Sequence, residues 1–306
     1  MIILKQGIRK LLDTNLKQPY AEWSDNVDYK LDAMIIHKNH IYRSIVPSSK
    51  GVDPSKNTGK WLLMGVDNAY AAIDLHSTTA SYMDKGLDHI MYKFGVAGFD
   101  MLALGGVLGE SVTIEQYNAT NVKIKTDTHK TGYARTCADT WYKYFYCKVP
   151  DHANLGVTRG VDIIQDPIMP DAAYVIVNVK KNSKDQASVA SMVGGSGVDI
   201  GDTQFGVTGE LIDYSDRITD DYGITELKHR EAQEIMNCTI EIPSKHTQAV
   251  KREIRERLGH ALMFIADPLA DTNYEHLIML GYIDRFNYSI PNGVITWGNL
   301  KIREVL

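Results

Sequence analysis

Alternating apolar and polar residues recur along this chain and predict strands in most of it. Residues 111–125 and 173–180 alternate with a period of two, as half-buried strands do. Residues 33–37 and 40–46 flank Lys38 and Asn39, a polar pair of the kind that closes a β-hairpin. The same pattern predicts strands near the C-terminus, at residues 261–266, 276–283, 293–297 and 300–305.

A helical period stands out in one stretch of the sequence. Apolar residues recur every four positions at Val250, Ile254, Leu258 and Leu262, and Ser244 is placed to cap the N-terminus of this helix. The other face, residues 251–253 and 255–257, is charged and mostly basic, which is typical of a solvated surface. One helix among several strands predicts a small α+β unit in the C-terminal third.

These segments predict a mainly β chain in three parts. Residues 1–66 are expected to form an N-terminal arm and a small aromatic-closed β module, residues 67–218 a β-sandwich or jelly-roll-like domain, and residues 219–306 the α+β unit with one main helix. The Asp-rich residues 213–223 are expected to be an exposed connector. Residues 185–209 contain six glycines and are predicted to be a long loop, which becomes ordered on assembly together with residues 1–18.

Composition supports the β assignment and limits the classes of partner that we expect. There are 17 Tyr against 6 Phe among 306 residues, and tyrosine favours strands. With 33 Lys and Arg against 38 Asp and Glu, the net charge is -5, so nucleic acid is not an expected partner. The first ten residues do not have the charge and apolar pattern of a secretory signal, and no apolar run is long enough for membrane insertion. The three cysteines, Cys137, Cys147 and Cys238, are expected to be reduced.

Motifs that would carry chemistry are missing or incomplete. Residues 51–60 lack the spacing of a phosphate-binding loop, and residues 194–201 lack that of a dinucleotide-binding turn. His37 and His40 have no third metal ligand at a suitable spacing, and Asp220 and Asp221 fit a solvated turn. We therefore expect no catalytic residue, no cofactor and no metal, and a protein that is not an enzyme.

The only group of residues whose spacing indicates a possible functional site consists of four aromatic residues: Trp23, Tyr29, Tyr42 and Trp61. Their order around the 33–46 hairpin resembles the small chitin-binding type of carbohydrate-binding module, in which a tyrosine-bearing strand and a final Trp close a compact aromatic core. The resemblance implies one of two roles, the core of the module or a platform on which sugar rings stack. Residues 45–48, which follow the tyrosine strand, add no further aromatic side chain.

A second resemblance begins at the same tryptophan. The spacing of Trp61, Gly65 and Asn68, followed by Asp74 and Thr78, is similar to a pattern in structural proteins of tailed bacteriophages. The C-terminal part, from residue 222 through the predicted helix to the final strands, also looks like theirs.

This second resemblance implies a structural component of the virion tail, baseplate or neck. Such a component is made in the host cytoplasm, forms a homo-oligomer and contacts neighbouring tail proteins, with strand addition along exposed edges as the expected contact. The alternative is a receptor-recognition protein that binds a host-surface glycan through Trp23, Tyr42 and Trp61. A carbohydrate-active enzyme is a third possibility, for which the sequence offers no clear carboxylate pair.

Overall fold

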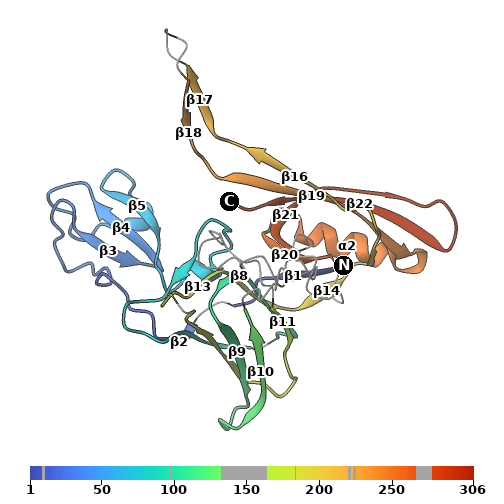
Figure 1. The fold of residues 1–306 in the computed structure, drawn as a ribbon. Helices are drawn as coiled ribbons and strands as arrows, with labels where there is room; N and C mark the ends of the chain where they lie inside the picture. The colour runs from blue at the N-terminus through green and yellow to red at the C-terminus, as the bar shows by residue number, and fades with distance from the viewer. Residues whose placement is uncertain are drawn as a thin grey trace, which may run out of the picture.

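The computed structural model describes residues 1–8, 11–96, 98–131, 164–182, 184–219, 222, 225–266 and 278–306. These residues are mainly β and form five sheets, with one α-helix, as the sequence pattern predicted (Figure 1). Within these ranges no helix is both long and apolar enough to cross a membrane. The predictions for Cys137, Cys147, Asp220 and Asp221 lie outside the described residues.

Two sheets packed face to face form the central β-sandwich. The first has the strand order β10-β9-β12-β7-β2 and the second the order β11-β8-β13-β6. Their strands are β2 (Leu11–Thr14), β6 (Ser81–Tyr82), β7 (His89–Gly95), β8 (Met101–Leu108), β9 (Ser111–Tyr117), β10 (Lys123–Lys130), β11 (Ile164–Pro167), β12 (Tyr174–Lys180) and β13 (Ser188–Gly195). Alternate residues of β12, namely Val175, Val177 and Val179, are buried in the core between the sheets, which confirms the strand predicted at 173–180.

The strand predicted at 111–125 is a hairpin instead. β9 ends at Tyr117, and the chain turns at Asn118 before β10 begins. The Asn118 side chain accepts hydrogen bonds from the backbone amides of Thr120 and Val122, at 3.0 and 2.9 Å. Asparagine often closes a turn in this way, so the polar residues here end one strand rather than continue it.

The prediction of a glycine-rich loop at 185–209 is wrong, because residues 188–195 form β13, a buried strand inside its sheet. All eight residues of β13 are buried, and the strand lies between β8 and β6. A Cβ added to Gly194 would lie 2.8 Å from the Phe99 ring, and one added to Gly195 would lie 2.1 Å from the Lys5 carbonyl oxygen. The glycines therefore permit close packing of backbone against its neighbours.

A larger sheet, here called the C-terminal sheet, has the order β14-β1-β20-β21-β22-β19-β15, with β16 also paired to β19. Its strands are β1 (Ile2–Lys5), β14 (Gly197–Asp199), β15 (Asp202–Thr203), β16 (Thr208–Asp213), β19 (Ala232–Pro243), β20 (Leu262–Ile265), β21 (Ile278–Ser289) and β22 (Ile295–Glu304). Residues 2–5 thus pair within the chain, so this part of the predicted N-terminal segment 1–18 needs no partner to become ordered. The strand pairing also crosses both expected domain boundaries.

The one α-helix of the described residues, α2 (Thr247–Arg257), packs on one face of the C-terminal sheet through Val250 and Ile254. It is shorter than the sequence predicted. A 3-10 turn at Ser244–His246 precedes it, Leu258 is exposed, and Leu262 already belongs to β20. Gly259, at φ +77°, takes the left-handed conformation that commonly ends a helix.

Residues 19–66 form the small N-terminal module, which stands at the side of the sandwich (Figure 1). Its sheet has the order β3-β4-β5, with β3 at Met34–His37, β4 at His40–Ser44 and β5 at Trp61–Val66. Lys38 and Asn39 connect β3 to β4 with φ values of 49° and 67°, which confirms the predicted hairpin. This pair of positive φ values is typical of a tight two-residue turn.

The described residues of the expected connector at 213–223, namely 213–219, belong to a β-ribbon, and 222 lies between its two strands. We call residues 208–231 the arm, which comprises β16, β17 (Asp216–Thr219), β18 (Thr225–Lys228) and the segments between them. β16 pairs with β19 at the base, and β17 pairs only with β18 among the described strands. In Figure 1 the arm rises away from the sandwich and the helix.

We expect Gly195→Ala to lower the free energy of unfolding by about 1–3 kcal/mol, because the added methyl group must displace backbone at Lys5. Gly209→Ala is the matched control, since its Cβ would meet nothing closer than 3.9 Å, and we expect a change within about 0.5 kcal/mol. Urea unfolding monitored by circular dichroism measures both. Equal stabilities for the two variants would contradict this account of β13.

Candidate functional site

The structure brings the four predicted aromatic residues together in the N-terminal module. Trp61 is 2% exposed, and Tyr29 and Tyr42 are each 9% exposed. With Ile35 they form the core of the module, and Trp23 packs against them. The Tyr29 and Trp61 rings meet edge to face, with centroids 5.5 Å apart. Because both rings are buried, Trp61 and Tyr42 do not offer a stacking surface.

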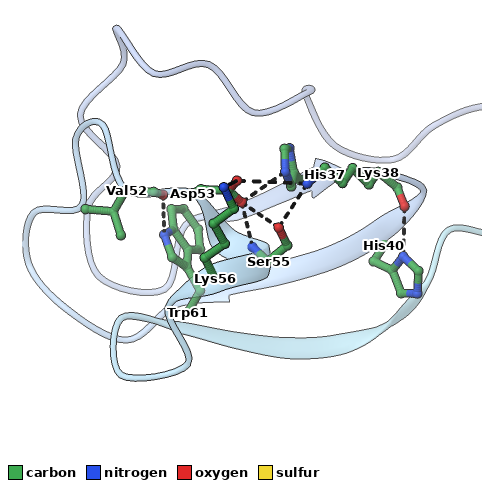
Figure 2. Close-up of polar contacts among 8 residues, drawn as sticks. All are labelled: His37, Lys38, His40, Val52, Asp53, Ser55, Lys56 and Trp61. Carbon is green, nitrogen blue, oxygen red and sulfur yellow. Dashed lines mark hydrogen bonds and ion pairs between the residues drawn. The ribbon is translucent and has the colours of Figure 1, made fainter.

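Trp61 is fixed by the loop that leads to it. Its indole Nε1 donates a hydrogen bond to the Val52 carbonyl oxygen at 3.1 Å (Figure 2). The next residue, Asp53, caps the 3-10 turn Pro54–Lys56, accepting from the Ser55 backbone amide at 2.9 Å and from its hydroxyl at 2.7 Å. The loop therefore closes the aromatic core with satisfied polar groups.

Charges gather around Asp53. His37 Nε2 lies 3.1 Å from one carboxylate oxygen, and the Nζ atoms of Lys38 and Lys56 lie 3.9 Å from the other (Figure 2). The hydrogen bond from the Ser55 side chain, helped by Lys38 and His37, holds the pKa of Asp53 below its usual value. Burial, with a smaller contribution from the Asp53 charge, raises the pKa of Tyr42.

The two neighbouring histidines do not share a ligand. His37 faces Asp53, whereas Nδ1 of His40 lies 2.8 Å from the Lys38 carbonyl oxygen. Across the described ranges, no group of three His, Cys, Asp or Glu side chains is placed to hold a metal. Cys238 is a buried apolar residue of the C-terminal sheet, and burial raises its pKa to about 12.

A hollow of about 190 Å³ lies beside Trp23, between the module and Tyr70. The Trp23 ring meets His37 edge to face at 5.0 Å, and its buried Nε1 has no hydrogen-bond partner among the described residues. Sites that take small molecules usually exceed about 300 Å³, so this hollow is small for a sugar ring with its hydroxyl shell.

Several large apolar side chains of the arm are exposed to solvent. Tyr222 is 91% exposed, Leu211 73%, Leu227 67% and Ile218 58%. Sequence reasoning missed this surface because the Asp-rich composition suggested a connector. The sequence pattern that could have predicted a ribbon is two short strand-like runs, residues 216–219 and 225–228, on either side of Gly223, a residue type that favours turns.

A second exposed apolar surface lies on β5, and we call Leu62, Leu63 and Met64 the apolar edge. All three are exposed, although they are consecutive in one strand. β5 is an outer strand of its sheet, paired to β4 alone, so one side of its backbone is open. An exposed apolar run on an unpaired strand edge is a preferred site for addition of another strand.

Comparison with known proteins finds only weak structural similarities. No protein-family model matches the sequence, and no curated protein matches it. Among solved structures, the chain is similar to chitosan-binding module 1 of a chitosanase/glucanase from Paenibacillus sp. IK-5, at 17% identity over 41% of this chain and 83% of that chain, with a TM-score of 0.26. It is also similar to a family 32 carbohydrate-binding module from C. perfringens NanJ, solved with galactose, at 14% identity over 41% and 82%, with a TM-score of 0.26. TM-scores this low do not establish a shared fold.

We expect Trp61→Ala to unfold the N-terminal module, at a cost of about 3–5 kcal/mol, because it removes the most buried ring of the aromatic core. Leu63→Ala on the same strand is the matched control and should change stability by less than about 0.5 kcal/mol. Limited proteolysis, with mass spectrometry to locate cleavage within residues 19–66, measures whether the module is folded. A folded Trp61→Ala variant that has lost affinity for a glycan would identify a stacking platform instead.

Asp53→Asn should lower the melting temperature at pH 7, because the stability linked to a depressed carboxyl pKa is present above its unfolded value of about 3.9. That stability is lost as pH falls through the lowered pKa of the folded state. The melting curves of the wild type and the variant should therefore converge below about pH 4. A difference that stays constant from pH 7 to pH 3 would show that ionisation of Asp53 is not involved.

Proposed function

We propose that this protein is a non-enzymatic structural component that assembles with itself, the arm of one copy docking on the apolar edge of the next. The observation that carries the proposal is the arm, a ribbon whose described strands pair with the rest of the chain only at the base and which bears five large exposed apolar side chains. An isolated two-stranded ribbon is only marginally stable in water. Ile218 pairs with Glu226 and Leu227 with Arg217, so Ile218 and Leu227 lie on opposite faces of the ribbon. A partner that covers the apolar side chains of either face would stabilise the ribbon.

Charge favours the N-terminal module of a second copy as the partner. The arm has seven acidic against three basic residues, whereas the module, residues 19–66, has six basic against five acidic residues. Leu62, Leu63 and Met64 supply the apolar surface there, and the open side of β5 can accept a strand. The two surfaces therefore complement each other in charge, in polarity and in backbone hydrogen bonding.

The donor and acceptor surfaces are different parts of the chain, which determines the kind of assembly. A contact between two unlike surfaces leaves one free arm and one free edge after each addition. Such heterologous contacts form a ring when the rotation closes and a filament when it does not. We propose a closed ring.

We place this assembly in the tail, baseplate or neck of a tailed-phage virion, after synthesis in the host cytoplasm. The support is the sequence resemblance that starts at Trp61 and Gly65 and returns in the C-terminal part of the chain. Neighbouring tail proteins would contact the faces of the ring that the arm and the apolar edge leave free.

The test is the mass of the purified full chain by light scattering, with negative-stain images of the same sample. We expect a defined oligomer for the wild type and a 34.3 kDa monomer for the arm variant Leu211→Glu/Ile218→Glu/Leu227→Glu. Val294→Glu is the matched control, because it places the same charge at an apolar residue that is 73% exposed but distant from the arm in the fold. A monomeric wild type, or an arm variant of unchanged mass, would refute the proposal.

A mixing experiment tests the pairing of arm with apolar edge. The edge variant Leu63→Glu/Met64→Glu keeps its arm, and the arm variant keeps its edge. Each should be monomeric alone, but an equimolar mixture should form dimers, because it has one intact combination of arm and edge. Absence of dimers in the mixture would exclude the apolar edge as the acceptor.

A further inference from the structure

The C-terminal sheet carries α2 on one face and an open hollow on the other. The hollow has a volume of about 370 Å³ and lies over β19, β21 and β22, next to the base of the arm. On these strands, Met236, Ile240 and Ile302 point towards the helix and are buried. Residues of the alternate positions face the hollow, because side chains along a strand alternate between the two faces. They are Asn237, Thr239, Arg285, Asn287, Asn299 and Lys301.

Strand register arranges these six side chains in two rows. Lys301 lies opposite Asn237 on one side and opposite Arg285 on the other. Asn299 likewise lies between Thr239 and Asn287. A row with two cations therefore runs beside a row of amides and a hydroxyl.

The pairing of Lys301 with Arg285 is unfavourable in the free protein. Like charges directly opposite each other on neighbouring strands destabilise a sheet. Neither side chain forms an ion pair with a described residue, and the nearby Asp284 carboxylate is paired with Arg303 at 3.3 Å. An anion held between Lys301 and Arg285 would remove this repulsion and gain two charge-assisted hydrogen bonds.

The second row suits hydroxyl groups. Thr239 donates to the Asn299 side-chain oxygen at 2.9 Å, which leaves the Asn299 amide N–H groups available. Asn287 has no hydrogen bond to a described residue, so it can both donate and accept. A simple anion only accepts hydrogen bonds, whereas a sugar hydroxyl does both.

From these contacts we infer that the hollow binds an acidic saccharide, a sugar ring that carries a carboxylate. The carboxylate lies between Arg285 and Lys301, and the ring hydroxyls bond to Asn287 and Asn299. Only Thr208, at the base of the arm, belongs both to the arm and to the lining of this site, and the site includes no residue of the apolar edge. The proposed docking of arm on apolar edge requires no ligand, so saccharide binding would be an additional property of the protein.

Isothermal titration of the full chain tests this with trigalacturonic acid as the probe and maltotriose as its neutral counterpart. We expect the acidic trisaccharide to bind and maltotriose to bind at least tenfold more weakly. Arg285→Gln and Lys301→Gln should each weaken binding of the acidic probe by tenfold or more, and Asn287→Ala by about threefold to tenfold. Arg252→Gln is the matched control, because Arg252 is an exposed arginine of α2, on the opposite face of the sheet.

Two further probes separate a saccharide site from a plain anion site. Inorganic phosphate and a triglutamate peptide carry the charge without the ring hydroxyls. If either binds as tightly as trigalacturonic acid, and Asn287→Ala changes nothing, the site recognises charge alone and the inference fails. It also fails if trigalacturonic acid does not bind at millimolar concentration, or if Arg285→Gln/Lys301→Gln leaves its affinity unchanged.

Discussion

The close contact between β13 and the N-terminal strand holds the two largest parts of this protein together. The Gly7 amide donates to the Gly194 carbonyl oxygen at 2.6 Å, and Gly195 passes so close to Lys5 that no side chain fits between them. Around this contact, Leu4, Val193 and Met263 form a buried cluster between the sandwich and the C-terminal sheet. The position of β1, and with it the register of the C-terminal sheet, therefore depends on glycine at the end of β13.

This arrangement leaves specific surfaces without a partner inside the chain. The helix covers one face of the C-terminal sheet, and the sandwich covers part of the other through Leu280 and Met263. The rest of that second face is the polar hollow, while the arm continues from the same sheet into solvent. Both proposed interactions thus come from one sheet that is larger than the elements packed on it. They remain physically distinct, because the arm exposes apolar side chains and the hollow exposes unpaired cations and amides.

The N-terminal module uses its aromatic residues differently from a sugar-binding surface. Trp61 and Tyr42 stabilise the module by filling its core, and the loop with Asp53 closes over them. A module of this size has little room for a core, so a few large rings supply most of its buried apolar area. What the module offers to partners is then the outer strand β5 and an excess of basic residues.

The sequence by itself determined the features that depend on neighbouring residues. The turn at Lys38 and Asn39 and the alternation in β12 follow from local pattern, and the structure has both. For the aromatic residues around Trp61, the resemblance implied either a core or a stacking platform, and packing in the folded module decides for the core. Tertiary structure alone decided the features that depend on contacts between distant residues. The glycine-rich β13 has no hydrophobic period, because β8 and residues 5–7 determine its packing. Likewise, Arg285 and Lys301 become neighbours only through strand register, which no local sequence pattern encodes.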